Sequence, residues 1–432
     1  MTSHENLTQL SASETATRLQ LRTLSAEHVM QAYLARIAER EPEVMAWRSI
    51  NTAAALAQAR ALDRGPIKGP LHGLPLGVKD LFDTRDFPSG YGSPIYEQHC
   101  PGNDAAAVAL CRQAGAIVLG KTVTTEFATF TPGPTRNPHN PLHTPGGSSS
   151  GSAAAVAARM VPLALGTQTA ASIIRPAAYC GIVGFKPSFG LIPRAGVKSL
   201  SESLDTVGGF GSCVADVALL TSVLADAPQW RRLKFDGKPR IGFCQTPFWD
   251  QATDPARLAL ERARQQLIAA GAEVIDVQLP PGFEQLAGVH DQVMCAEAFK
   301  ALADERLNHW NLLSDNLQQM LTRGEQVGYP QNRYNRALIA SAHVELAQTF
   351  ADCDLLLAPS ACGEAEQGLQ RTGDPLFSRT WSLLGLPSLH LPTGLGPSGL
   401  PVGVQLVGPP GSDTQTLGLC HWVEHQLKSK KD

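Results

Sequence analysis

The chain has 432 residues, 43% of them hydrophobic, and a formal net charge of −3, so it can bury a large core. This nearly balanced charge gives no reason to expect nucleic acid or an anionic membrane as a partner. The sequence contains no run of about 18 apolar residues, so no segment is expected to span a membrane.

The chain has nine cysteines, an odd number that cannot all pair within one chain, and no two of them form a CxxC motif. This pattern favours free thiols in a reducing compartment. The N-terminal stretch MTSHENLTQLSASE is polar and lacks the apolar region of a signal peptide. The sequence therefore predicts a cytoplasmic protein.

In chain order, two helices are expected within residues 5–40. The second has Ser25 as its N-cap and an apolar face, and Pro42 is expected to stop it. Further helices are predicted over 53–62, 103–113, 152–158 and 216–224, and buried strands within 71–81, 116–120 and 161–166. Residues 131–145 and 185–211 are rich in Gly, Pro or Ser and are expected to be irregular.

The second half of the chain continues this alternation. Strands are predicted over 240–244, 273–277, 354–358, 387–392 and 402–407, and helices over 255–270, 283–350 and 414–427. Neither an internal repeat nor a low-complexity linker interrupts the pattern. It predicts an α/β fold in one domain over 1–432, with its core in about 65–245 and 350–428, and region 283–350 is a candidate cap over a substrate site.

Lys79 ends an apolar run, LPLGVKD. Burial disfavours a charged ammonium and lowers its pKa, and a neutral lysine is a competent general base near neutral pH. The alternative interpretation is an ordinary ion pair between Lys79 and Asp80 or Asp83.

Two stretches of small residues carry candidate hydroxyls. Ser148, Ser149, Ser150 and Ser152 fill a glycine-rich turn before a helix, where an N-cap is the ordinary role of a serine. Ser172 follows Thr169, Ala170 and Ala171 directly after a predicted buried strand. Such a turn exposes a hydroxyl beside successive backbone N–H groups, the arrangement that a nucleophile with an oxyanion hole needs.

Three motifs, GGSSSGSAAAVAA, LALGTQTAASIIRPAAYCGIVGFKPS and GLPLGVKD, resemble the amidase signature family of serine hydrolases. The likeness extends from about residue 10 to residue 428. It implies a single domain in which helices cover both faces of a central, mixed, twisted β-sheet.

The resemblance also implies a Ser–cis-Ser–Lys triad made of Lys79 as general base, Ser148 as bridge and Ser172 as nucleophile. The peptide bond between Gly147 and Ser148 is then expected to be cis. The oxyanion hole would be formed by the backbone N–H groups of Thr169, Ala170, Ala171 and Ser172. The implied chemistry is acyl transfer and needs no metal and no cofactor.

The chain departs from the family pattern GTDTGGSIR, since it reads GTQTAASII. Gln168 stands in place of the aspartate and Ile174 in place of the arginine, so both partners of a charged pair are replaced together. Ala170 and Ala171 replace two glycines and require backbone angles acceptable to alanine.

Three functions follow from these residues. The first is hydrolysis of the C(=O)–N bond of a small amide, carbamate or urea-type compound. This small molecule is the expected partner, and the sequence leaves open whether the chain forms a homodimer. The second is the glutamine-hydrolysing component of a tRNA-dependent amidotransferase, its A chain. The third is a non-catalytic binding protein on the same scaffold. The substrate pocket is expected to be walled by 125–131 and 283–350, and Trp310, Tyr329 and Tyr334 suggest tolerance for aryl groups.

Overall fold

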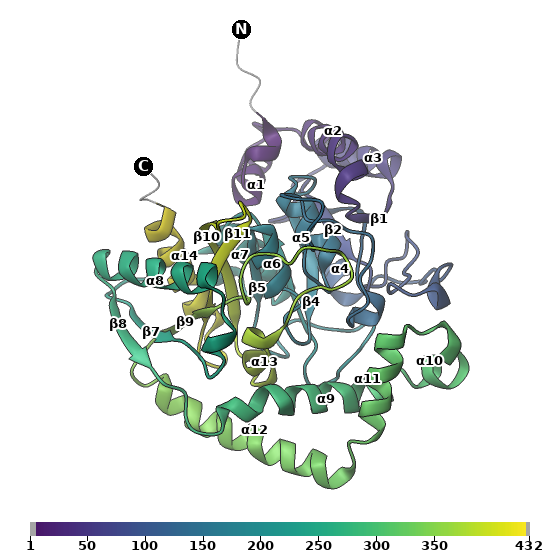
Figure 1. The fold of residues 1–432 in the computed structure, drawn as a ribbon. Coiled ribbons are helices and arrows are strands. Elements are labelled where there is room, and N and C mark those ends of the chain that lie inside the picture. The colour runs from purple at the N-terminus through teal and green to yellow at the C-terminus, as the bar shows by residue number, and fades with distance from the viewer. Residues whose placement is uncertain (1–5, 429–432) are drawn as a thin grey trace.

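The computed structural model describes residues 6–428, which are organised around one sheet of 11 strands (Figure 1). The strands are β1 (Trp47–Ile50), β2 (Pro75–Lys79), β3 (Ile117–Thr122), β4 (Leu163–Gln168), β5 (Val183–Lys186), β6 (Thr206–Gly211), β7 (Arg240–Cys244), β8 (Glu273–Val277), β9 (Leu355–Pro359), β10 (Ser388–Leu395) and β11 (Pro401–Val407). Their spatial order is β1-β3-β2-β4-β6-β5-β10-β11-β9-β7-β8. Strand β2 is parallel to β3 and β4, and β7 is parallel to β8 and β9, whereas the other pairs are antiparallel. The predicted α/β class with a mixed sheet is confirmed.

Helices cover the sheet on both faces. They are α1 (Ala12–Gln20), α2 (Ala26–Val44), α3 (Thr52–Arg64), α4 (Ala106–Gln113), α5 (Ser150–Ala157), α6 (Ile174–Cys180), α7 (Val214–Leu224), α8 (Asp254–Ala269), α9 (Leu286–Ala301), α10 (Ala303–Asn308), α11 (Asp315–Glu325), α12 (Tyr329–Thr349), α13 (Leu376–Leu383) and α14 (Asp413–Lys428). Helices α5 and α6 contact each other and the middle strands, while α7, α8 and α14 form a second group.

The predicted helical region 283–350 consists of α9 to α12, drawn in green below the sheet in Figure 1. Helices α9, α11 and α12 share an apolar cluster that includes Leu317 and Leu346. The same cluster contains Leu81, two residues after Lys79, and Phe127. The helical region is therefore packed directly against the segment that follows β2.

Several predicted boundaries are wrong. Helix α2 does not stop before Pro42 but runs to Val44, where Met45 adopts a left-handed conformation and ends it. Segment 185–211 is not irregular at its ends, because β5 and β6 occupy them. Strand β6 is rich in glycine, so its side chains give little signal for a strand. It forms because its backbone pairs with β4 on one side and with β5 on the other. Strand β1 and helices α6 and α13 were not predicted.

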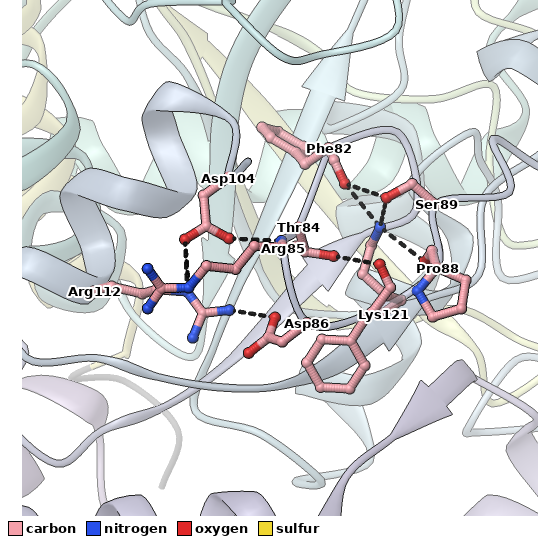
Figure 2. A network of polar contacts seen from close by, with 10 residues as sticks. Phe82, Thr84, Arg85, Asp86, Pro88, Ser89, Asp104, Arg112 and Lys121 are labelled. Atoms are coloured by element: carbon pink, nitrogen blue, oxygen red, sulfur yellow. Dashed lines mark hydrogen bonds and ion pairs between the residues drawn. The ribbon is translucent and has the colours of Figure 1, made fainter. Parts of the chain in front are cut away.

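The predicted helix 103–113 begins later, at Ala106. Asp104 lies outside it, accepts a hydrogen bond from the Arg85 backbone N–H at 3.0 Å, and pairs with Arg112 at 3.2 Å (Figure 2). Its carboxylate therefore fixes the neighbouring loop instead of capping the helix.

All nine cysteines are free thiols, as predicted. None of the helices in residues 6–428 combines the length and apolar character needed to cross a membrane. Predictions about residues 1–5 of the N-terminal stretch lie outside the described residues.

Candidate active site

Lys79 is the last residue of β2 and is fully buried. Its Nζ lies 2.8 Å from Ser148 Oγ and 2.7 Å from Thr167 Oγ1. Burial lowers the pKa of the Lys79 ammonium well below its usual value, and the Asp205 carboxylate opposes this only in part. A neutral amine between two hydroxyls can accept a proton from one and donate a hydrogen bond to the other.

The alternative ion pair of Lys79 with a neighbouring aspartate is not present. Asp80 instead pairs with Lys121, whose Nζ lies 2.9 Å from the carboxylate. Figure 2 shows the Lys121 ammonium also donating to the Ser89 hydroxyl, at 2.6 Å. Asp83 accepts a hydrogen bond from the Tyr91 hydroxyl at 2.5 Å. Both carboxylates thus have other partners.

Ser148 follows a cis peptide bond with Gly147, as the resemblance implied. The Gly147 carbonyl accepts a hydrogen bond from the Arg175 guanidinium at 2.7 Å. Arg175 also donates to Thr372 Oγ1 at 3.0 Å and to the Gly373 carbonyl at 2.7 Å. A buried arginine from α6 therefore holds the turn that presents Ser148.

The expected N-cap role of the neighbouring serines is wrong. Ser149 stands at the start of α5, but its side chain caps no helical N–H. Its hydroxyl donates to the Thr167 carbonyl at 3.2 Å, and the Ser152 hydroxyl donates to the Leu165 carbonyl at 2.8 Å. These hydroxyls tie α5 to β4, because close packing of the small residues brings helix and strand together.

Ser172 lies in the turn that follows strand β4, as the sequence predicted, and helix α6 begins after this turn. None of the backbone N–H groups of 169–172 donates to a protein acceptor within residues 6–428, although these residues are buried. Ala170 and Ala171 both avoid positive φ, so alanine is tolerated where the family has glycine. The turn therefore presents a row of unpaired N–H groups beside a hydroxyl.

Within the described residues, the Ser172 hydroxyl makes no hydrogen bond, including none with Ser148. Ser172 borders a small hollow of about 20 Å³ between the 128–130 loop and helices α9 and α11, which contribute Met294 and Met320. The structure thus brings Lys79 and Ser148 into contact and places Ser172 at the edge of a small hollow.

A larger cavity of about 520 Å³ adjoins this hollow, and the two share Ala128, Thr169 and Leu200. Thr167, whose hydroxyl contacts Lys79, also lines the cavity. Asp205 lies in its wall, and its carboxylate accepts a hydrogen bond from the Thr169 hydroxyl at 2.6 Å. Both predicted walls, 125–131 and 283–350, therefore contribute to the cavities.

The predicted aromatic residues of the helical region line neither cavity. Tyr329 is 79% exposed and Tyr334 is 54% exposed, and Trp310 borders a separate surface depression. Thr167 is a contact that sequence reasoning missed. Strands β2 and β4 are parallel neighbours, so their C-terminal residues meet at one edge, but this pairing is known only from the fold.

The sequence was also compared with families of known proteins. A profile of the Amidase family matches residues 28–417. The chain belongs to the amidase signature family. It is 31% identical to the A chain of the glutamyl-tRNA(Gln) amidotransferase of Neisseria meningitidis serogroup C, over 97% of this chain and 98% of that protein.

Solved amidases have the same fold. A crystal structure of an amidase superposes with a TM-score of 0.88 at 31% identity, covering 96% of this chain and 100% of the other. The native peptide amidase from Stenotrophomonas maltophilia gives 0.83 at 30% identity, covering 97% of each chain. The protein is thus an amidase-family hydrolase of the class that acts on C–N bonds.

In this amidase, Gln168 stands at the position of the family's aspartate, and its side chain binds backbone N–H groups. Its Oε1 accepts hydrogen bonds from the N–H groups of Ile173 and Ile174 at 2.9 and 3.0 Å. A neutral amide can satisfy these two donors as a carboxylate would. Ile174 is fully buried, so the replaced charged pair leaves no charge stranded at either position.

Proposed function

We propose that the protein hydrolyses the C(=O)–N bond of a small amide, carbamate or urea-type substrate through an acyl-enzyme on Ser172. The observation that carries this proposal is the buried Lys79, whose Nζ lies 2.8 Å from the Ser148 hydroxyl. Among residues 6–428, no carboxylate lies within ion-pair distance of this lysine. A lysine in this setting favours the neutral amine, which can act as a general base.

In the proposed mechanism, the Ser172 hydroxyl attacks the carbonyl carbon while its proton passes to Ser148, and the Ser148 proton passes to Lys79. When the tetrahedral intermediate collapses, the C–N bond breaks and the proton returns through Ser148 to the leaving nitrogen. Water then attacks the ester by the same proton route and releases the acid. Catalytic hydrogen bonds often tighten only when substrate binds, which fits the unbonded Ser172 hydroxyl.

The unpaired N–H groups of 169–172 are the proposed oxyanion hole. A donor of this kind contributes roughly 3–4 kcal/mol to the stabilisation of the transition state. The donors belong to the backbone and are fixed before substrate arrives, so they need little reorganisation when the negative charge develops.

The cavities favour a small substrate. The hollow at Ser172, about 20 Å³, has room for roughly one water molecule, so only a small acyl portion fits there without movement of Met294 or Met320. The larger cavity is lined by both signs of charge, with Arg194, Lys198 and Lys300 against Glu202, Asp205 and Glu297. This lining suits a compact polar molecule better than a long hydrocarbon chain.

The glutamine-hydrolysing A chain of an amidotransferase is the second candidate function, favoured by the 31% identity to the Neisseria protein over 97% of this chain. It would use the same three residues, with glutamine as the source of ammonia. Against it stand the altered residues around the nucleophile, Gln168, Ala170, Ala171 and Ile174. A non-catalytic binding protein would not need Lys79 beside Ser148.

A hydrolysis panel tests the proposal, with aryl acylamides, aryl carbamates, ureas and glutamine each given to the wild type and to Ser172→Ala. Ser150→Ala is the matched control, because the Ser150 hydroxyl only contacts the Val123 carbonyl at 3.4 Å. We expect cleavage of a small amide, carbamate or urea that is lost in Ser172→Ala and kept in Ser150→Ala. Ammonia from glutamine alone would support the amidotransferase function. No hydrolysis, together with no fluorophosphonate labelling of Ser172, would contradict both enzymes.

A further inference from the structure

Two polar side chains outside the glycine and serine stretches contact the turn that carries Ser172. His290, on α9, lies fully buried with its Nε2 3.0 Å from the Thr169 carbonyl oxygen. Ser382, on α13, donates its hydroxyl to the Ala170 carbonyl at 2.7 Å. The two contacts therefore fall on consecutive carbonyl groups of the turn.

The tautomer of His290 follows from its partner. A carbonyl oxygen can only accept, so Nε2 carries the proton and Nδ1 does not. Nδ1 is buried and has no hydrogen-bond partner within residues 6–428. Burial lowers the pKa of His290 to about 4, so the ring is neutral near pH 7 and acts there as a single, directed donor.

Each of these contacts sets the direction of one N–H group. The carbonyl of one residue and the N–H of the next belong to the same planar peptide unit and point in opposite directions. Holding the Thr169 carbonyl therefore orients the Ala170 N–H, and holding the Ala170 carbonyl orients the Ala171 N–H. Both N–H groups lack a protein acceptor in the described part of the chain.

A third contact joins the same network. Gln168 Nε2 donates a hydrogen bond to Ser382 Oγ at 3.0 Å, while its Oε1 accepts from the N–H groups of Ile173 and Ile174 at the start of α6. The Ser382 hydroxyl thus accepts from Gln168 and donates to Ala170, which fixes the direction of its proton. The turn is held from the strand side by Gln168 and from the helical region by His290.

We propose that His290 and Ser382 are positioning residues that aim the Ala170 and Ala171 N–H groups at the oxyanion of the substrate. This inference rests on the proposed acyl-enzyme hydrolysis at Ser172. Neither side chain touches the reacting atoms, and each acts through one peptide unit. His290 comes from α9, so the helical region 283–350 positions the oxyanion donors as well as walling the cavities, whereas Ser382 comes from α13, outside that region.

The test compares His290→Gln, His290→Asn, His290→Leu and Ser382→Ala on whichever substrate the wild type cleaves. The Nε2 of glutamine can reach the position of the imidazole Nε2, whereas asparagine is one bond shorter. We expect His290→Leu, His290→Asn and Ser382→Ala to lower kcat roughly 10-fold to 100-fold, with KM changed less than about twofold, because an aimed donor acts mainly in the transition state. His290→Gln is expected to recover most of kcat.

The matched control is His390 on β10, a second fully buried histidine, whose Nδ1 lies 2.7 Å from the hydroxyl of Ser360, the residue that follows β9. No hydrogen bond joins His390 to residues 169–172 within the described part of the chain. His390→Leu is expected to lower stability without the kcat loss. The inference would be overturned if folded His290→Leu and Ser382→Ala both kept the wild-type kcat, or if His390→Leu lowered kcat as much as His290→Leu does. Either result would leave the proposed hydrolysis at Ser172 standing. Absence of Ser172-dependent hydrolysis and labelling in the wild type would overturn both.

Discussion

The buried Lys186 predicts a measurable pH dependence of the free energy of unfolding. The residue is the last of β5 and is fully buried, and its Nζ donates a hydrogen bond to the Pro187 carbonyl at 2.9 Å. Burial lowers its pKa to about 7, with partial opposition from the Asp413 carboxylate. That carboxylate accepts two hydrogen bonds from Ser188. The perturbation is Lys186→Met, which keeps a long side chain and removes the charge.

The sign and size of the effect follow from proton linkage. In the unfolded chain a lysine titrates near 10.4, so between pH 7 and about 10.4 the unfolded state holds a proton that the folded state has released. Unfolding then takes up a proton, and the folded state gains stability as pH rises. The gain is about 1.4 kcal/mol per pH unit and about 4–5 kcal/mol across the window. Below pH 7 this contribution is constant.

The assay is reversible urea unfolding of the wild type and of Lys186→Met at pH 7, 8, 9 and 10. Because other groups titrate equally in both proteins, the difference in their free energies of unfolding isolates Lys186. We expect the free energy of unfolding of the wild type, minus that of Lys186→Met, to rise by about 1.4 kcal/mol per pH unit over this range. Lys68→Met, which changes an exposed lysine, should show no such slope. A wild-type minus Lys186→Met difference that stays flat from pH 7 to 10 would refute the reasoning.

Three further predictions follow from the site. Asp80→Ala should lower stability by about 3–5 kcal/mol in thermal unfolding because it strands the buried Lys121 charge, and adding Lys121→Met should restore most of the loss. Gln168→Leu should cost about 2–5 kcal/mol in the same measurement, because it leaves two buried N–H groups of α6 unpaired; an unchanged Tm would contradict the capping role. The lowered pKa of Lys79 predicts that kcat/KM rises with pH and levels off well below 10.4; a rise that continues to pH 10.4 in a pH–rate profile would argue against a neutral base.

The elements that were predicted well are those whose signal is local. Strands β7 and β8 have the predicted bounds, because each is a short apolar or alternating run closed by turn residues. The features that were missed depend on other parts of the chain. The residue before α6, Ile173, cannot cap the helix with its side chain, and Gln168 from β4 accepts hydrogen bonds from the N–H groups of Ile173 and of Ile174, where α6 begins. Strand β6 is held by its two neighbours rather than by its side chains.

The candidate site divides in the same way. The motifs placed Lys79, Ser148 and Ser172 through a family resemblance, and the small residues around Ser172 predicted a turn with free N–H groups. Which carboxylate pairs with which lysine was left open by the sequence, because Asp80 and Asp83 are both near Lys79 in the chain. Side chains alternate across a strand, and the fold turns Asp80 toward Lys121 on β3.

The sequence by itself determined the α/β class, the run of elements and the identity of the small-residue turns, since these depend on short-range patterns of size and polarity. Only the tertiary structure decided the partners of the buried polar groups. Thr167 meets Lys79 because β2 and β4 are parallel neighbours. His290 meets Thr169 although 121 positions separate them in the chain. Such contacts form because a buried donor must find an acceptor wherever the packed helices and strands bring one within reach.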